Sequence, residues 1–106
     1  VWHIYRAGLP VDSVSTIPAE IIVSVELDDA VEAVVGTMLE DTFNERRFPG
    51  EGDIDIPSFV AAIKSTGFDG PWGVEMLSTD FRLLPVREAT RRSFETSIRF
   101  LDESGN

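Results

Sequence analysis

The strongest constraint on the fold comes from a short apolar segment, residues 21–27 (IIVSVEL), in which four consecutive β-branched or small residues lead into alternation. This pattern predicts a β-strand that Asp28 and Asp29 end. Similar patterns predict strands at residues 72–77 and at residues 1–6 (VWHIYR). Helices or loops separate the three strands, and this order predicts an α/β fold with a parallel sheet and right-handed crossovers.

The segments between the strands carry helix and loop signals. Residues 11–17 have a weak helical spacing and predict a short helix or turn, and residues 37–46 predict a helical turn. Pro49 and two glycines make residues 48–52 (FPGEG) a loop. Loops of this length are functional more often than not, so we treat this segment as a candidate part of a site.

Two longer helices are predicted. The first begins after Asp55, a residue suited to cap a helix N-terminus, and ends at Gly67. One apolar stripe runs along this helix and contains Phe59, Val60 and Ile63. The second helix covers residues 85–103, and its predicted buried side carries Thr90, Phe94, Ile98 and Leu101.

Ionisable side chains occupy equivalent places in the three predicted strands. Successive side chains of a strand point to opposite faces, which places His3, Glu26 and Glu75 on the less apolar faces, near the C-terminal ends. The opposite faces carry Trp2, Ile4, Val23, Val25, Leu27, Trp72, Val74 and Met76. Ligands bind at the C-terminal ends of parallel strands, so we predict a common site that contains the three ionisable residues.

Each of the three residues also has a purely structural explanation. His3 could be a hydrogen-bonded core histidine, and Glu26 a charge that protects a sheet edge. Glu75 could form an ion pair with Arg46 or Arg82. A carboxylate in a parallel sheet is costly unless it is paired or binds a metal. All three residues lie on the less apolar face of their predicted strand and near its C-terminal end, which favours one shared site.

The composition excludes several classes of function. The chain has 19 acidic and 9 basic residues, and its net charge of −10 argues against nucleic acid or an anionic membrane as a partner. It has no cysteine, which excludes disulfides, thiolate zinc sites and thiol catalysis. No apolar run is long enough to span a bilayer. With 106 residues there is room for one domain, which we expect to lie in the cytoplasm.

Two motifs carry a resemblance to a known family. The loop Arg-x-x-Pro-Gly-x-Gly spans residues 46–52, and the strand Gly-Pro-x-x-x-Glu spans residues 70–75. With the segments WHIYRAG and VSVELDD, they make residues 1–106 resemble the C-terminal part of a sugar phosphate isomerase/epimerase of the xylose isomerase-like TIM-barrel superfamily. The resemblance implies the last three βα units, strands six to eight, of an incomplete (β/α)8 barrel. We therefore expect the sequence to begin partway through a fold.

The resemblance also implies a metal site. The superfamily binds a divalent metal through two glutamates, an aspartate and a histidine or glutamine. Glu75 matches the last glutamate, a metal ligand that can also share in proton transfer. Glu26 matches the histidine or glutamine, so its carboxylate is a departure, and Asp29 matches an acidic residue three positions later. The oxygen-rich ligand set favours Mn²⁺, Mg²⁺ or Co²⁺ over structural zinc.

Substrate contacts follow from the same resemblance. His3 matches the histidine of an Asp-x-x-His motif that contacts substrate, and the metal-binding aspartate of that motif would lie before Val1. Arg46 matches an arginine that reaches the oxygen groups of the substrate, with Arg47 as the alternative, although a solvated loop charge would also explain Arg46. The first glutamate of the metal site would lie on an earlier strand.

The implied reaction is abstraction of a proton beside a carbonyl, and its return elsewhere through an enediolate, which isomerises or epimerises a sugar or sugar phosphate. Two alternatives remain open: a dehydratase or lyase of the same superfamily, and a catalytically silent fragment that acts only in assembly. An endonuclease of the superfamily is disfavoured by the net charge. Three strands would leave two open sheet edges, so we also expect a homo-oligomer.

Overall fold

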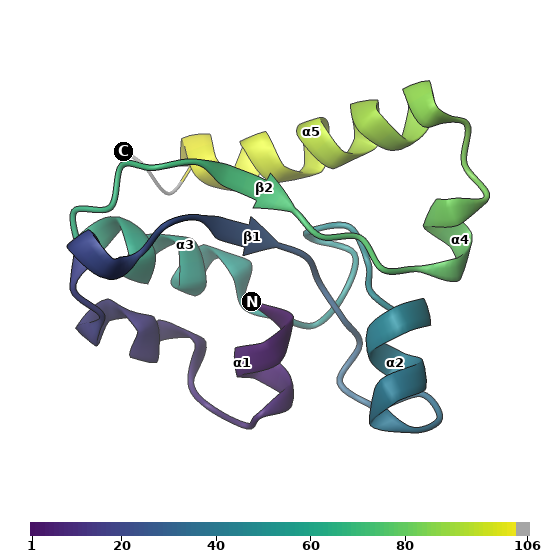
Figure 1. Cartoon of the computed structure of the whole chain (residues 1–106), viewed down its shortest axis with the longest axis horizontal. Coiled ribbons are helices and arrows are strands. Elements are labelled where there is room, and N and C mark those ends of the chain that lie inside the picture. Colours follow the sequence, from purple (N-terminus) through teal and green to yellow (C-terminus); the bar gives the residue numbers. More distant parts are fainter. Residues whose placement is uncertain (104–106) are drawn as a thin grey trace.

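The computed structural model describes residues 1–103 and, within them, a two-stranded parallel sheet with helices packed around it (Figure 1). The elements in chain order are α1 (Trp2–Arg6), the 3-10 helices η1 (Val11–Thr16) and η2 (Ala19–Ile21), β1 (Val25–Leu27), α2 (Met38–Asn44), α3 (Ile56–Ser65), β2 (Trp72–Val74), α4 (Thr79–Arg82) and α5 (Val86–Glu103). No helix within the described range is long and apolar enough to cross a membrane.

The strands β1 and β2 run in the same direction, with Val25 opposite Trp72 and Leu27 opposite Val74 (Figure 1). The helix α3 lies between them in the chain and belongs to the connection that makes them parallel. The predicted α/β class and parallel pairing are therefore confirmed. Each strand is shorter than predicted, because the 3-10 helix η2 takes up residues 19–21 and Val23 is 85% exposed.

Residues 1–6 form the helix α1, so the predicted first strand is wrong, and the sheet within residues 1–103 has two strands rather than three. Backbone N–H groups of Tyr5 and Ala7 donate to carbonyls four residues earlier at 3.1 and 3.0 Å. Trp2 is buried in the core, and Arg6 reaches a buried carboxylate. These tertiary contacts override the strand preference of a segment too short to show a clear period.

The core lies between β1, η1 and α3. Asp55 caps α3 by accepting a hydrogen bond from the Ser58 backbone N–H (3.1 Å), and Gly67 follows the helix with a φ of +88°. Both ends of this helix are as predicted. The buried apolar residues include the predicted stripe and the inward face of β1: Trp2, Val14, Val25, Leu27, Ala30, Ile54, Ile56, Phe59, Val60, Ala62 and Ile63.

The helix α5 buries only part of the predicted face, because Leu101 packs partly buried against the core and Ile98 is half-buried. Ala89 and Ser97 are buried, whereas Thr90 is exposed and Phe94 is 64% exposed. The small side chains let the helix pack closely, and the larger apolar ones border an open groove of about 600 Å³ between α5 and β2. The groove is lined by Trp72, Gly73, Val74, Phe81, Thr90, Ser93, Phe94, Ser97, Ile98 and Leu101.

Candidate functional site

Two glutamates lie close together at the ends of the parallel strands. Glu26 is the middle residue of β1 and pairs with Gly73, which leaves room for its side chain. Glu75 follows β2, and its backbone N–H donates to the Leu27 carbonyl at 3.1 Å. The side chains of Val25 and Leu27 are buried on the other face of β1. The alternation predicted for β1 is confirmed, and the structure brings Glu26 and Glu75 together.

The two carboxyl groups affect each other. A hydrogen bond with Glu75 raises the pKa of Glu26, and partial burial and repulsion between the two groups raise it further. The same hydrogen bond lowers the pKa of Glu75, with help from the hydrogen bond and positive charge of Arg46. Neighbouring carboxylates whose pKa values are pushed apart can work as one ionised and one protonated group.

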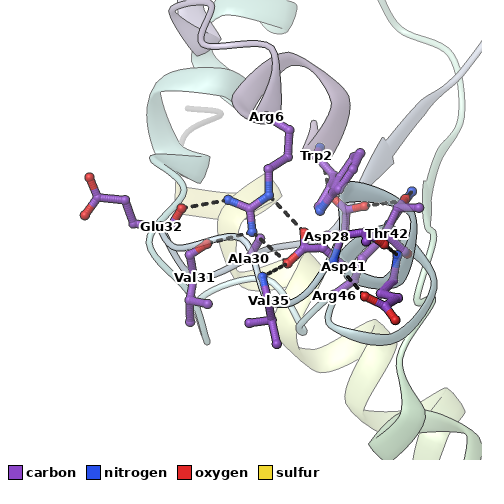
Figure 2. A network of polar contacts seen from close by, with 12 residues as sticks. Trp2, Arg6, Asp28, Ala30, Val31, Glu32, Val35, Asp41, Thr42 and Arg46 are labelled. Carbon is purple, nitrogen blue, oxygen red and sulfur yellow. Dashed lines mark hydrogen bonds and ion pairs between the residues drawn. The ribbon is translucent and has the colours of Figure 1, made fainter.

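Arg46 lies beside the two glutamates and is 3% exposed. Its Nη1 donates to Asp28 Oδ2 at 2.8 Å and also to Glu75. Its Nε and Nη2 donate to the carbonyl and the Oγ1 of Thr42, at 3.1 and 2.7 Å (Figure 2). The guanidinium carbon lies 4.8 Å from the centre of the Trp2 ring. The structural alternative for Glu75, an ion pair with Arg46, is therefore present, and Arg46 is not a solvated loop charge.

Asp28 contacts Arg46 at the site, although its sequence position predicted only that it ends a strand. It is 2% exposed and accepts hydrogen bonds from Arg46 and from the Trp2 backbone N–H (3.0 Å). Burial raises its pKa, and the charge of Arg46 opposes that shift. A signal was available, because Asp28 has the same parity as Glu26 and would share its face in an extended strand.

His3 reaches the site from α1 rather than from a strand. Its side chain is exposed, and its ring meets the Trp2 ring edge to face with centroids 5.1 Å apart. The imidazole is close enough that its charge helps to lower the pKa of Glu75. His3 therefore acts on Glu75 through charge alone, from a helix rather than from the predicted strand, and a site shared with Glu75 stays a prediction.

Asp29, expected to match an acidic family position, organises the loop that follows Arg46. It is fully buried, and its carboxylate accepts backbone hydrogen bonds from Ala30 (2.8 Å), Gly50 (2.9 Å) and Ile54 (3.0 Å). Its backbone exchanges two hydrogen bonds with Arg47, whose side chain is exposed. Hydrogen bonds to Asp29 therefore hold the predicted loop against the segment that follows β1.

The donor set suits a hard divalent cation but is incomplete. Glu26 and Glu75 offer carboxylate oxygens, and a cation would offset the repulsion between them. Within residues 1–103, no group of three or more His, Cys, Asp or Glu side chains is arranged to hold a metal ion. A metal bound at this place would need further ligands besides these two carboxylates.

The chain is similar in sequence to part of a dehydratase and part of an isomerase. No protein-family model matches the chain. The chain is 32% identical over 91 residues to the 3-dehydroshikimate dehydratase of Pseudomonas putida, an alignment that covers 86% of the chain and 14% of the relative. It is 24% identical over 97 residues to the inosose isomerase of Bacillus subtilis, which covers 92% of the chain and 34% of the relative.

Solved structures show the same fold. An IolI protein with a bound zinc atom superposes with a TM-score of 0.84 and 23% identity, over 97% of this chain and 36% of that one. A xylose isomerase-like TIM barrel/4-hydroxyphenylpyruvate dioxygenase fusion protein superposes with a TM-score of 0.76 and 28% identity, over 95% of this chain and 17% of that one. The chain therefore has the α/β fold of part of a TIM barrel, and it spans 14% of the dehydratase and 34% of the isomerase.

Proposed function

Because this chain is homologous to enzymes of the xylose isomerase-like TIM-barrel superfamily, we propose that residues 1–106 are the C-terminal portion of a divalent-metal-dependent sugar or sugar phosphate isomerase or epimerase. The observation that carries the proposal is the pair of carboxylates, Glu26 and Glu75, at the ends of parallel strands. The inosose isomerase relatives support an isomerase.

In the proposed reaction Glu75 takes a proton from the carbon beside a substrate carbonyl and returns it elsewhere. The ion pair with Arg46 keeps Glu75 ionised and in place, so that it can accept this proton. Glu26 and Glu75 would hold the metal, which when bound acts as a Lewis acid on substrate oxygens. Carboxylate ligands lead us to propose Mn²⁺, Mg²⁺ or Co²⁺, and the zinc-bound IolI structure supports a divalent metal.

His3 and Arg46 have different roles in this proposal. His3 is exposed on α1, and in this proposal its imidazole donates a hydrogen bond to a sugar oxygen. Arg46 is buried against Asp28 and Glu75, so we assign it first to orienting Glu75. Direct contact between Arg46 and substrate stays a prediction, as does the alternative contact through the exposed Arg47.

A dehydratase is the second candidate, because the dehydratase of P. putida has a higher identity to the chain, 32%, than the inosose isomerase of B. subtilis, 24%. Proton removal beside a carbonyl by Glu75 would begin either reaction. Incubation in D₂O separates them: an isomerase incorporates deuterium into an inosose or ketose without loss of water, whereas a dehydratase releases water from 3-dehydroshikimate.

Metal binding tests the proposed site directly. Titration of the chain with Mn²⁺, followed by paramagnetic broadening of NMR signals, should show saturable binding in the micromolar to millimolar range centred on residues 26 and 75. Glu75→Gln should abolish this binding, and Glu20→Gln, on the exposed part of η2, should leave it intact. Uniform, unsaturable broadening would contradict the metal site and favour a catalytically silent fragment that acts in assembly.

We extend the proposal to location and partners. A net charge of −10 supports a small-molecule substrate and argues against nucleic acid or an anionic membrane as a partner. We place the protein in the cytoplasm, in keeping with its lack of cysteine. The open groove beside β2 supports a homo-oligomer.

A further inference from the structure

The guanidinium of Arg46 is oriented by one residue of α2. Thr42 accepts from two of its nitrogens, through Oγ1 (2.7 Å to Nη2) and through its carbonyl oxygen (3.1 Å to Nε). The remaining nitrogen, Nη1, faces Asp28 and Glu75. Because the guanidinium is planar, fixing Nε and Nη2 also fixes the direction in which Nη1 points. Thr42 therefore holds the guanidinium from one side, while Asp28 holds Nη1 from the other at 2.8 Å.

The position of Thr42 depends in turn on the residue before it. Asp41 is fully buried, and both its carboxylate oxygens accept from Arg6 of α1, at 2.9 Å from Nε and 3.3 Å from Nη2. The Val35 backbone N–H donates to the same carboxylate at 3.0 Å. Although burial acts to raise the pKa of Asp41, these hydrogen bonds lower it overall, so the pair with Arg6 is charged. A buried, charged pair allows few alternative geometries.

Arg6 also holds the irregular segment that leads into α2. Its guanidinium donates to the carbonyls of Val31 (2.8 Å) and Glu32 (3.0 Å), as Figure 2 shows. One side chain from α1 therefore fixes both the approach to α2 and the buried carboxylate within it. Residues 28–37 contain no regular helix or strand, so these hydrogen bonds supply order that secondary structure does not.

We propose that Thr42, placed by the Arg6–Asp41 ion pair, is the positioning residue that directs Arg46 toward Glu75. The inference rests on the proposed function, in which Glu75 acts on the substrate. Five residues form one line of contacts, from Arg6 to Asp41, along α2 to Thr42, and through Arg46 to Glu75. The distance between Arg6 and the site is bridged by a short helix rather than by direct contact.

The test measures the mobility of the Arg46 side chain in the 106-residue chain. NMR follows how fast the guanidinium N–H protons of Arg46 exchange with water. Thr42→Val keeps the shape of the side chain but removes Oγ1, and we expect exchange to become about tenfold faster. Thr42→Ser restores a hydroxyl and should return the rate to near the wild-type value. Thr90→Val makes the same chemical change on the exposed face of α5 and should have no effect.

A second variant tests the link to α1 without altering α2. Arg6→Lys keeps the charge but cannot bridge Asp41 and the two carbonyls at once, so Arg46 exchange should again accelerate. Unchanged exchange in Thr42→Val would overturn the role of Thr42, as would equal acceleration in Thr42→Ser. Unchanged exchange in Arg6→Lys would overturn the role of the ion pair. Mn²⁺ binding is measured separately, so failure of the metal site is distinguishable from failure of this inference.

Discussion

Arg46 and Arg47 are neighbours in sequence but differ in what they contact. Arg46 is 3% exposed and paired with Asp28, which is 2% exposed, whereas the side chain of Arg47 is exposed. Arg46→Met would remove the hydrogen-bonded cation of the buried Asp28 and leave only the Val1 amino group at 3.8 Å, so we expect a loss of roughly 3–5 kcal/mol in the free energy of unfolding. Arg47→Met should change it by less than about 0.5 kcal/mol. Urea unfolding measures both, and equal losses would contradict the pairing.

Glu26 gives the site a pH dependence with a definite sign. Its pKa in the folded chain is raised above 4.5, first by the hydrogen bond with Glu75. The folded state therefore binds the Glu26 proton more tightly than the unfolded state, and stability falls as pH rises from 4.5 through the raised pKa. Glu26→Gln should remove this loss and become more stable than the wild type above that window.

The gain in Glu26→Gln should stay below about 1 kcal/mol, because the side chain is exposed and water screens the repulsion. Urea unfolding at several pH values measures it. Glu20→Gln, also exposed, controls for the loss of one negative charge anywhere on this acidic chain. A Glu26→Gln variant that tracks the wild type at every pH would show that the two carboxyl groups do not interact.

At the scale of elements, the loop after Arg46 depends on a glycine for its close approach to the segment that follows β1. A Cβ at Gly52 would lie 2.5 Å from the Ala30 carbonyl oxygen and 2.5 Å from Asp29 Oδ1. Gly52→Ala must therefore displace the loop, and we expect a loss of more than about 2 kcal/mol in unfolding free energy. Gly8→Ala, where the backbone has a φ of +73° and the space is open, should cost about 1–2 kcal/mol from strain alone.

Thermal or urea unfolding of the two alanine variants separates steric overlap from backbone strain. Near-UV circular dichroism of Gly52→Ala should also change, because the loop carries Phe48, which packs against the Phe81 ring with centroids 5.7 Å apart. If Gly8→Ala costs as much as Gly52→Ala, close packing against Asp29 does not govern this loop.

The sequence predicted the elements whose signals are local. The helix α3 has a cap at Asp55, a clear apolar stripe and a glycine at its end, all within 13 residues, and it forms as predicted. The strand predicted at residues 1–6 failed because its ends are held by distant contacts, the burial of Trp2 and the pair between Arg6 and Asp41. The face of α5 was only partly predicted: Leu101 packs against the core as expected, whereas Phe94 is exposed and the small residues Ala89 and Ser97 are the buried ones.

The part of the site that lies on strands could be predicted from the alternation of side chains along a strand. Parity alone brought Glu26 and Glu75 together, and the same rule extended by one step would have included Asp28. Arg6 and Thr42 carried no such signal. The Arg6–Asp41 contact joins residues 35 apart, across an irregular stretch of chain whose path no periodicity describes, whereas Thr42 and Arg46 are 4 residues apart at the end of α2. The contact between Arg6 of α1 and Asp41 of α2 is therefore the part of this site that needed a structure.

At the scale of the whole molecule, the net charge opposes self-association, whereas the exposed groove favours it. The net charge of −10 keeps copies of the chain apart at low ionic strength. The groove between β2 and α5 favours association, because it exposes apolar side chains and lies beside a strand that pairs, within residues 1–103, with β1 alone. Salt screens the repulsion but leaves the apolar contact in place, so association should increase with ionic strength.

Self-association through this groove gives a prediction that single residues can test. Phe94 is 64% exposed at the groove, and Phe94→Glu adds a charge where two copies would meet, so it should shift the monomer–oligomer equilibrium strongly toward the monomer. Leu83→Glu adds the same charge at a 79% exposed position outside the groove and should shift it only slightly. Light scattering at high micromolar concentration and moderate salt measures both. A wild-type chain that stays strictly monomeric there would refute association, and equal effects of the two variants would place the contact elsewhere.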